Sequence, residues 1–381
     1  MNTPLDRRSG PRFVLAAGGT GGHLFPAQAL AERLVKTGAR VVLATDRRAD
    51  AFARDVPGVE ICQIWAGRIG GGPIRAARGF AETAVGILQA RLLLRRLSPD
   101  AVVGFGGYTS IPTMLAAIRL SVPTAIHEQN AVLGRANRLL AGRARCIATG
   151  FAATTGLRSA DKLRAVHTGN PVRPEVLAVA GAEYRPPQPG EPVEILITGG
   201  SQGARIFAEI VPEALAFLPP ALRGALRISQ QARPEDCDRV SVQLKAAGIA
   251  AEISSFFTDI PRRLARAQLV ICRSGASTIA ELAAVGRPAL LVPYPFATDD
   301  HQTANARAFA DSGAAWVMPQ PEFSAARLSG VLGELLADPA GLLHAAAQAR
   351  RFAPDDAADR LAALVLGLAA GSGFAGEERA A

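Results

Sequence analysis

Three glycine clusters in this chain of 381 residues combine residue types that suit phosphate binding: GGTGGH at 18–23, GFGGY at 104–108 and GGSQGAR at 199–205. Each cluster follows an expected strand and precedes an expected helix. Glycine permits positive φ and close approach to a ligand, and a helix N-terminus offers free N–H groups and a partial positive charge. The alternative is that each cluster only forms a tight strand–helix turn.

A fourth strand–loop–helix junction, CRSGASTIAE at 272–281, adds a carboxylate. Ser277, Thr278 and Glu281 share one helical face by their spacing. In one interpretation Thr278 and Glu281 form a capping box. In the other, phosphate binds at the helix start and Glu281 accepts hydrogen bonds from ribose hydroxyls. One carboxylate cannot fully serve both the helix backbone and a sugar, so the two interpretations can hold together only in part.

Several site classes are disfavoured by what the motifs lack. The sequence has no GxxxxGK[ST] in these clusters, which argues against a nucleoside-triphosphate P-loop. The first and third clusters also fail the GxGxxG spacing, so a dinucleotide oxidoreductase is a weak second choice. The cysteines are scattered, which disfavours structural zinc or a disulfide framework and fits a reducing cytoplasm. They are Cys62, Cys146, Cys237 and Cys272.

Short apolar runs that alternate with helical patterns must position these loops. The runs predict strands at 13–17, 40–44, 101–105, 124–127, 146–149, 194–198, 226–229, 251–254, 269–272 and 289–292. Periodic segments such as 26–36 and 278–285 predict helices between them. This alternation predicts α/β architecture, with doubly wound parallel sheets and helices on both faces.

The pattern runs twice, and about 150 residues per domain also suggests two domains. Between the runs lies a proline-rich segment at 184–192 that can form neither a helix nor a central strand. We place the functional boundary just before it and expect domains at 12–172 and 173–351 that face one cleft. The sequence leaves open whether the last helix, about 352–369, packs back on the first domain.

The charge is unevenly distributed along the chain. Residues 1–170 hold 23 Lys/Arg against 10 Asp/Glu, whereas the whole chain has a formal net charge of +9. A basic first half implies an anionic neighbour: nucleic acid, an acidic membrane face or a phosphorylated ligand. No apolar run approaches the roughly 20 residues needed to span a bilayer.

Taken together, the motifs resemble the MurG family, the UDP-N-acetylglucosamine:N-acetylmuramyl-(pentapeptide)-pyrophosphoryl-undecaprenol N-acetylglucosamine transferases. The matching segments are AGGTGGHLFP at 17–26, GFGGYTSIP at 104–112, HEQN at 127–130, GNPVR at 169–173, GGSQGAR at 199–205, RSGA from 273 through Glu281, and DDHQ at 299–302. They occur in the family's order. The resemblance implies the GT-B glycosyltransferase fold, with two Rossmann-like domains facing an interdomain cleft.

The resemblance also implies substrates and site residues. The second domain is expected to hold UDP-N-acetylglucosamine, and the first to hold lipid I, the undecaprenyl-linked acceptor; transfer with inversion gives a β-1,4 linkage and lipid II. The residues implied to bind substrate are Thr20, Gly21, Gly22, Asn130, Arg173, Ser201, Phe257, Ala276, Ser277, Thr278, Ile279, Ala280, Glu281 and Gln302. Phe257 matches a position whose backbone holds uracil, and the register at His301/Gln302 is uncertain by one residue.

An inverting transfer requires a base for the acceptor 4-hydroxyl and charge relief on departing UDP. His23 is the first candidate for the base, because it ends the first glycine loop and can titrate near neutrality. Its alternative role is to cap a helix or bond a neighbouring loop. Glu128 is the reserve candidate, or orients a neighbour. No Asp-x-Asp motif appears, and Asp299-Asp300-His301 fits a solvated loop better than a cation site, so we expect no metal and no cofactor.

The segment 67–97 carries six arginines against one acid, interleaved with apolar residues. The arginines are Arg68, Arg75, Arg78, Arg91, Arg95 and Arg96. Such a segment suits peripheral contact with an anionic membrane surface, although an amphipathic helix with a solvated basic face accounts for part of the pattern. With the resemblance, it places the chain at the cytoplasmic face of the inner membrane, where cell-wall synthesis and division proteins are further candidate partners.

Two competing functions come from other classes. UDP-N-acetylglucosamine 2-epimerase shares the broad fold but needs no lipid acceptor. A basic RNA- or DNA-binding protein would also be positively charged, but the sequence lacks aromatic-interleaved basic runs and any nucleic-acid motif. We therefore expect no nucleic-acid partner.

Overall fold

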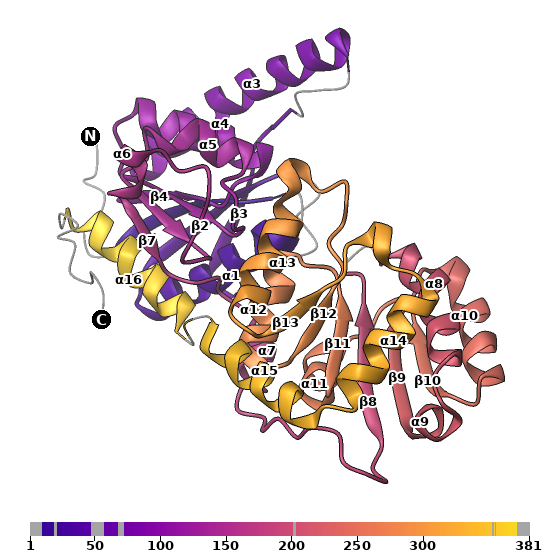
Figure 1. The fold of residues 1–381 in the computed structure, drawn as a ribbon. Coiled ribbons are helices and arrows are strands. Elements are labelled where there is room, and N and C mark those ends of the chain that lie inside the picture. The colour runs from indigo at the N-terminus through magenta and orange to yellow at the C-terminus, as the bar shows by residue number, and fades with distance from the viewer. Residues whose placement is uncertain are drawn as a thin grey trace, which may run out of the picture. The chain divides into compact units, whose positions relative to one another are not determined.

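A computed structural model describes residues 10–18, 21–46, 57–67, 72–200, 203–352, 354 and 356–371. The chain divides into two compact units, one made of Met1–Pro171 and Asp356–Ala381 and the other of Val172–Asp355. Each unit contains one parallel β-sheet (Figure 1). The strand–helix repeat that the sequence shows twice thus forms two separate α/β units.

Seven strands form the sheet of the first unit in the order β3-β2-β1-β4-β5-β6-β7. Their bounds are β1 Arg12–Ala16, β2 Arg40–Thr45, β3 Val59–Gln63, β4 Ala101–Gly104, β5 Thr124–Glu128, β6 Cys146–Thr149 and β7 Ala165–His167. Neighbouring parallel strands need a crossover, which is usually helical. The helices of this part of the chain are α1 Gly21–Lys36, α3 Pro73–Leu97, α4 Gly107–Arg119, α5 Arg135–Ala141 and α6 Ser159–Lys162.

Alternate residues of each central strand face opposite helical layers. In β1, Phe13 and Leu15 pack with α1, whereas Val14 packs on the other side with α3, α4 and α5. All three side chains are fully buried. Burial on both faces explains why the central strands read as continuous apolar runs.

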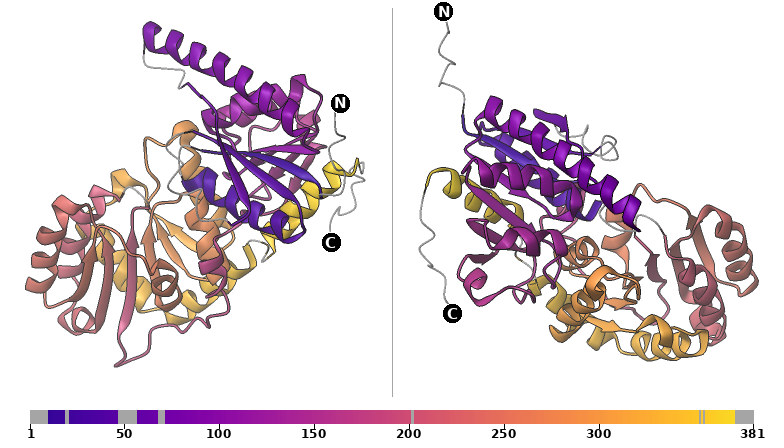
Figure 2. Two further views of the ribbon diagram at one scale, coloured as in Figure 1. Left: turned by 180° about the vertical axis from the view of Figure 1, so that it is seen from behind. Right: turned by 90° about the horizontal axis from the view of Figure 1, so that it is seen from above.

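The last helix, α16 (Ala357–Ala369), belongs to the first unit, which the sequence left open. It packs against α1, β4 and β5 of the first unit (Figure 2). Leu361, Val365 and Leu368 are buried in the same apolar cluster as β1. The end of the chain therefore completes the core of the first unit.

Six strands form the sheet of the second unit in the order β10-β9-β8-β11-β12-β13. Their bounds are β8 Val193–Thr198, β9 Leu226–Gln231, β10 Ala250–Ser254, β11 Leu269–Cys272, β12 Ala289–Leu291 and β13 Ala315–Val317. The α-helices are α7 Pro174–Leu177, α8 Arg205–Ala216, α9 Pro220–Ala225, α10 Pro234–Ala246, α11 Ile260–Arg266, α12 Ala276–Val285, α13 His301–Asp311, α14 Ala325–Leu336 and α15 Pro339–Phe352; η2 Thr298–Asp300 and η3 Gln320–Glu322 are short 3₁₀ helices. The α8, α10 and α14 helices contribute to one apolar cluster with β8, while α12 packs with α7, α13 and α15.

The ten expected strands all form, with bounds within two residues of those expected. Three further strands, β3, β7 and β13, were not expected, and each lies at an edge of its sheet. The helix expected to begin at Pro26 begins instead at Gly21, so Gly21, Gly22 and His23 belong to the first turn of α1. The glycine loop is therefore shorter than the sequence suggested.

We expect Leu361→Ala to destabilise the first unit by about 2–5 kcal/mol, because Leu361 is fully buried between α16 and the sheet. Leu343→Ala on α15 is the control, since that side chain is 48% exposed, and it should cost less than about 0.5 kcal/mol. Urea unfolding followed by circular dichroism measures both. Equal losses would mean that α16 is not part of the core.

Candidate active site

The residues singled out in the first unit gather at the carboxyl edge of its sheet. Gly18 follows β1, Gly106 and Gly107 follow β4, and Glu128 ends β5. Strands β1, β4 and β5 are neighbours and parallel, so their carboxyl ends lie along one edge. In open α/β sheets this edge is where ligands bind.

The Glu128 carboxylate is almost completely buried, with 2% of the residue exposed, and both of its oxygens are occupied. Oε1 accepts from the backbone N and Nδ2 of Asn130 at 3.0 and 3.1 Å. Oε2 accepts from the Gly134 backbone N and from Asn137 Nδ2 at 2.8 and 2.9 Å. Four donors around one carboxylate satisfy both of its oxygens despite burial and fix the loop that carries Asn130.

Beside Glu128, the fully buried His127 ties β5 to the segment that leads into the second unit. Gln129 Nε2 can only donate, so His127 Nδ1 accepts at 3.0 Å and the ring proton lies on Nε2, which donates to the Gly169 carbonyl at 3.2 Å. Asn170 Nδ2 in turn donates to the Gln129 carbonyl at 2.8 Å. Burial lowers the pKa of His127 from 6.5 to about 4, and the nearby His23 adds to this lowering.

His23 lies in the first turn of α1, half-buried, with its imidazole against the backbone of Gly107. His23, Glu128 and Asn130 all lie at the carboxyl edge of the first sheet. Gly21 and Gly22 start the same helix, while Thr20 lies outside the described residues.

The matching edge of the second unit is organised around α12. Glu281, one turn into this helix, accepts from Arg173 Nε and Nη2 at 3.0 and 2.7 Å, both on Oε1. Within the described residues no hydrogen bond reaches Oε2 of Glu281. Burial raises the pKa of Glu281, and the Arg173 charge opposes that rise. Glu281 therefore keeps one oxygen for a ligand, in contrast to Glu128.

The start of α12 has a second unsatisfied group. Gly275 is the N-cap residue and makes no side-chain cap, so the capping box suggested for Thr278 and Glu281 is wrong. Ser277 Oγ is buried and has no hydrogen-bond partner among the described residues. A free hydroxyl beside the uncapped N–H groups of a ten-residue helix is suited to an anion.

The remaining predicted residues of this unit lie around the same edge. Gln302 is the second residue of α13. Its Oε1 accepts from the Tyr294 backbone N at 2.9 Å, and its carbonyl accepts from Ser274 Oγ at 2.8 Å. Phe257 follows β10 and is buried beneath the Arg263 guanidinium, 4.0 Å from its ring centroid. Ala276, Ile279 and Ala280 are buried in α12. Ser201 lies outside the described residues.

The Asp299-Asp300-His301 segment forms a strained turn. Asp299 and Asp300 have φ of 54° and 50°, a left-handed conformation that is uncommon for residues other than glycine. Asp300 Oδ1 accepts from Thr303 Oγ1 at 2.7 Å, and His301 Nδ1 bonds the Thr298 carbonyl at 2.8 Å. Among the described residues, no three His, Cys, Asp or Glu side chains are placed to hold a metal ion.

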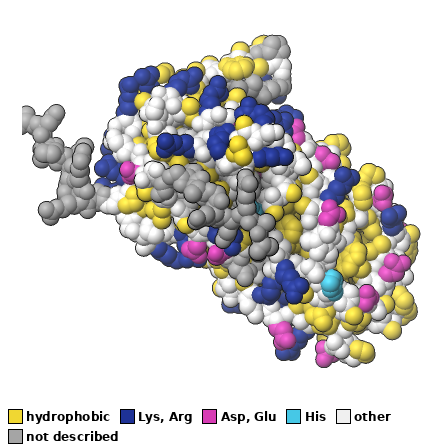
Figure 3. Space-filling view, turned by 60° about the vertical axis from the view of Figure 1, so that its left-hand side comes forward, with side chains coloured by type: hydrophobic (Ala, Val, Ile, Leu, Met, Phe, Trp, Pro, Cys, Tyr) yellow, Lys and Arg dark blue, Asp and Glu magenta, His cyan; other side chains and the backbone are white. Residues whose placement is uncertain are grey.

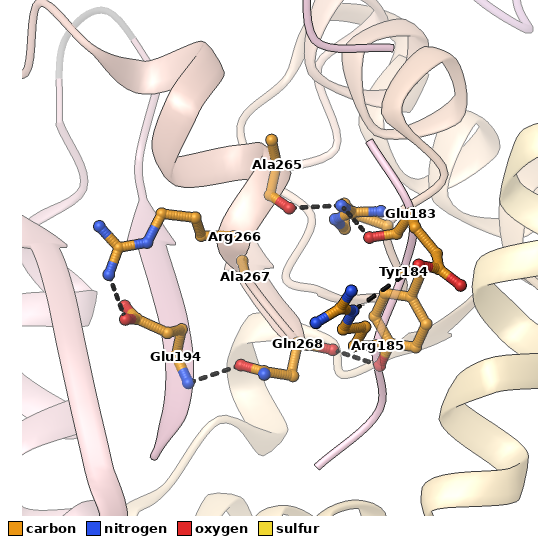
Figure 4. Close-up of a pocket in the computed structure, with 9 residues that line it drawn as sticks. Glu183, Tyr184, Arg185, Glu194, Ala265, Arg266, Ala267 and Gln268 are labelled. Carbon is orange, nitrogen blue, oxygen red and sulfur yellow. Dashed lines mark hydrogen bonds and ion pairs between the residues drawn. The ribbon is translucent and has the colours of Figure 1, made fainter. Parts of the chain in front are cut away.

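A separate hollow of about 200 Å³ lies at the opposite, amino edge of the second sheet (Figure 4). Its wall includes Arg287, which is 1% exposed and donates to the carbonyls of Leu264, Val285, Gly286, Ala182, Glu183 and Ala265. Desolvation lowers the pKa of Arg287 to about 10. Because these carbonyls already occupy the guanidinium, Arg287 holds the 182–183 segment in place rather than a ligand.

Sequence reasoning missed Asn137, on α5. Its Nδ2 donates to Glu128 Oε2 and to the His127 carbonyl, at 2.9 and 3.1 Å. Gln129 belongs to the HEQN motif at 127–130, but the sequence assigns it no role. In the structure its side chain donates to the Phe105 carbonyl and its own carbonyl accepts from Asn170. An asparagine in a short helix gives no sequence signal of its own, because its partners come from β5.

Two family models match the chain: the glycosyltransferase family 28 N-terminal domain over residues 13–149 and the C-terminal domain over residues 194–361. A relative from Rhodospirillum centenum is 56% identical, with 94% of each chain covered. One from Rhodospirillum rubrum is 54% identical, covering 96% of this chain and 92% of its own. Both are named UDP-N-acetylglucosamine–N-acetylmuramyl-(pentapeptide) pyrophosphoryl-undecaprenol N-acetylglucosamine transferase.

Among solved structures, MurG of Acinetobacter baumannii has a TM-score of 0.77 and 31% identity, over 94% of this chain and 99% of that one. The two doubly wound parallel-sheet units, the family 28 matches and this structural match place the chain among the glycosyltransferases of the GT-B class. The full-length identity to the named relatives narrows this class, and the chain belongs to the MurG family.

The network around His127 predicts acid sensitivity. Unfolded His127 binds a proton near pH 6.5, whereas the folded protein resists that proton until about pH 4. Stability is therefore complete above the unfolded pKa and falls as the pH drops through this window, by on the order of 3 kcal/mol. Urea unfolding between pH 7 and pH 4 should show a shallower loss for His127→Gln than for wild type, while exposed His344→Gln should match wild type. An unchanged slope in His127→Gln would contradict the buried neutral imidazole.

Proposed function

We propose that this chain transfers N-acetylglucosamine from UDP-N-acetylglucosamine to the 4-hydroxyl of lipid I, N-acetylmuramyl-pentapeptide-pyrophosphoryl-undecaprenol. The transfer inverts the anomeric carbon and yields lipid II for peptidoglycan. The observation that carries the proposal is identity of 54–56% to relatives of that name across almost the whole chain. The two site edges supply the chemistry, with the donor in the second unit and the acceptor in the first.

In the donor site, the free Oε2 of Glu281 accepts from ribose hydroxyls, and the diphosphate lies at the start of α12 beside Ser277. The backbone N–H groups of Ala276, Ser277 and Thr278 precede the first helix hydrogen bond, which Ile279 N donates to the Gly275 carbonyl. Together with the positive helix end they favour the charge of the diphosphate. Burial raises the pKa of Glu281, Arg173 opposes that rise, and its guanidinium adds a cation close to the nucleotide. Further contacts are assigned to the Phe257 backbone for uracil, Gln302 for the sugar and Ser201 for the diphosphate.

In the acceptor site, His23 removes the proton of the attacking 4-hydroxyl. The new C1–O bond forms as the bond from C1 to the UDP oxygen breaks, and UDP leaves with that electron pair. Glu128 is then a positioning group for Asn130, because its four donors leave neither oxygen for a substrate proton. Gly21 and Gly22 line the same edge, and Thr20, outside the described residues, is assigned to the acceptor with them. Arg173 and the α12 N-terminus meet the developing charge of UDP, so the proposed chemistry needs no metal.

Transfer of radiolabelled sugar from the donor to synthetic lipid I tests this proposal. We expect His23→Ala to lower kcat by about 10²–10⁴-fold, the usual contribution of a general base, with little change in donor KM. The exposed His344→Ala is the matched control and should behave as wild type. Turnover of His23→Ala within twofold of wild type would exclude His23 as the base.

The same assay has two further arms. Activity should persist in a chelator, and complete, reversible loss would contradict metal-independent chemistry. Donor incubated alone should remain unchanged, whereas its epimerisation would favour the 2-epimerase alternative.

We also propose that α3 contacts the anionic cytoplasmic leaflet that holds the acceptor. Within the described residues no helix is both long and apolar enough to cross a bilayer. One face of α3 is committed to packing: Gly86 lies directly against the Trp65 carbonyl and Gly79 against Gly67. The other face exposes large apolar side chains, namely Ile74, Phe80, Val85, Leu88 and Leu92 at 42–85% exposure.

Basic residues accompany this apolar face. Arg75, Arg78, Arg91, Arg95 and Arg96 are exposed on the same helix, and Arg68 lies outside the described residues. Lys and Arg side chains also cluster, interleaved with hydrophobic ones, over the surface of the first unit (Figure 3). An apolar stripe with a basic border favours the interface of an anionic bilayer, and each arginine near it contributes about 1 kcal/mol.

We expect Arg75→Glu/Arg78→Glu to weaken binding to vesicles containing phosphatidylglycerol more than tenfold at low salt, measured by sedimentation. Arg262→Glu/Arg351→Glu in the second unit is the control, because it makes the same charge change at exposed positions on other helices. Unaltered binding by the α3 variant would show that this helix is not the anchor.

A further inference from the structure

The second glycine cluster has a contact that a phosphate loop would not require. Gly107 is the first residue of α4 and has φ of 68°. A Cβ atom placed on it would lie 2.9 Å from His23 Cδ2 and 3.1 Å from His23 Nε2. Contacts of a Cβ atom below 3.0 Å essentially never occur, so any side chain at position 107 would have to displace the imidazole.

The neighbouring positions show that the loop is packed against side chains. A Cβ on Gly106 would face Asn137 Nδ2 at 3.3 Å, which belongs to the Glu128 network. Thr109 Oγ1 lies 3.6 Å from the Cβ position of Gly107 and 3.1 Å from that of Gly18. The first two glycine clusters therefore meet around Thr109, and the missing Cβ of Gly107 is the space that His23 fills.

We propose that Gly107 is a positioning residue for catalysis: its bare Cα face is the seat on which the His23 imidazole rests, and it sets the direction of the ring toward the acceptor hydroxyl. This inference rests on the proposed role of His23 as the base. A base acts only when its nitrogen lies within hydrogen-bond reach of the proton. A displacement of about 1 Å can cost roughly 10²-fold in rate.

The competing explanation is that Gly107 lets the backbone approach a phosphate of the acceptor. The two explanations differ in their coupling to His23. If Gly107 only positions the imidazole, a substitution of Gly107 has no further effect on kcat once His23 has been replaced. A phosphate contact acts independently of His23 and affects acceptor KM.

The test compares Gly107→Ala with Gly38→Ala in lipid I transfer. Gly38 has φ of 82° and no atom within 4 Å of its Cβ position, so it carries the same left-handed strain without a steric contact. We expect Gly107→Ala to lower kcat about 10- to 100-fold with donor and acceptor KM within twofold, and Gly38→Ala to match wild type. In the His23→Ala background, Gly107→Ala should lower kcat by less than a further twofold.

An independent readout follows the ring itself. The chain has five histidines, so the imidazole ¹⁵N signals can be assigned by comparison with His23→Ala. Gly107→Ala should shift the His23 signals and titration midpoint, while Gly38→Ala should not. The pair Gly107→Asn and Gly38→Asn repeats the comparison with a residue that tolerates left-handed φ, which covers the case of a poorly folded alanine variant.

Two results would overturn the positioning role of Gly107 while leaving His23 as the base. One is the same kcat in the Gly107 and Gly38 variants. The other is a slow His23→Ala enzyme in which Gly107→Ala lowers kcat further by as much as it does in wild type. Unchanged turnover in His23→Ala would instead remove the proposed base, and this inference with it.

Discussion

A buried carboxylate is costly unless N–H donors or cations surround it, and this constraint organises both edges of the molecule. Glu128 meets it completely, with four donors from the segment that follows β5. Glu281 meets it through one oxygen only, which Arg173 occupies. The first arrangement makes a rigid scaffold, whereas the second leaves an acceptor atom ready for a nucleotide. The same residue type therefore has two roles, and they are set by the number of donors.

The glycine clusters show a similar division. All of them look alike in sequence, as Gly-rich turns between a strand and a helix. In the first unit, the spaces left by Gly18 and Gly107 are filled by Thr45, Asp46 and Thr109, and by His23. In the second unit, Gly199 lies against the backbone of Gly203 and Ala204, whereas no atom of the described residues lies within 4 Å of the Cβ position of Gly200, as an approach to a ligand requires. Whether the space beside a glycine is filled by a neighbouring side chain or stays open for a substrate depends on the residues that pack around it.

A polar network at the end of β5 holds the segment that links the two units. His127, Gln129 and Asn170 join the first sheet to the segment at 169–171, and Arg173 joins the next residues to α12. The segment that links the two units is thus bonded on either side to residues proposed to serve the acceptor and the donor. Because His127 is held neutral, this junction adds no buried charge that would need a partner.

Sequence alone determined the α/β class, the two-fold repetition, the nine strands that lie inside the two sheets and the edge strand β10, because a strand covered on both faces is mostly apolar. It also located His23, Glu128 and Glu281 next to strand ends. It did not reveal β3, β7 and β13, since an edge strand is only half covered and its residues are mixed: in β7, Val166 is exposed while its neighbours are partly buried. The tertiary structure alone decided that α16 completes the first unit, that Asn137 reaches Glu128 and that His23 rests on Gly107. The α16 and His23 contacts join residues far apart in the chain, and their geometry depends on the sheet order, which no local pattern encodes. The Asn137–Glu128 contact spans only nine residues, but it depends on how α5 packs beside the end of β5.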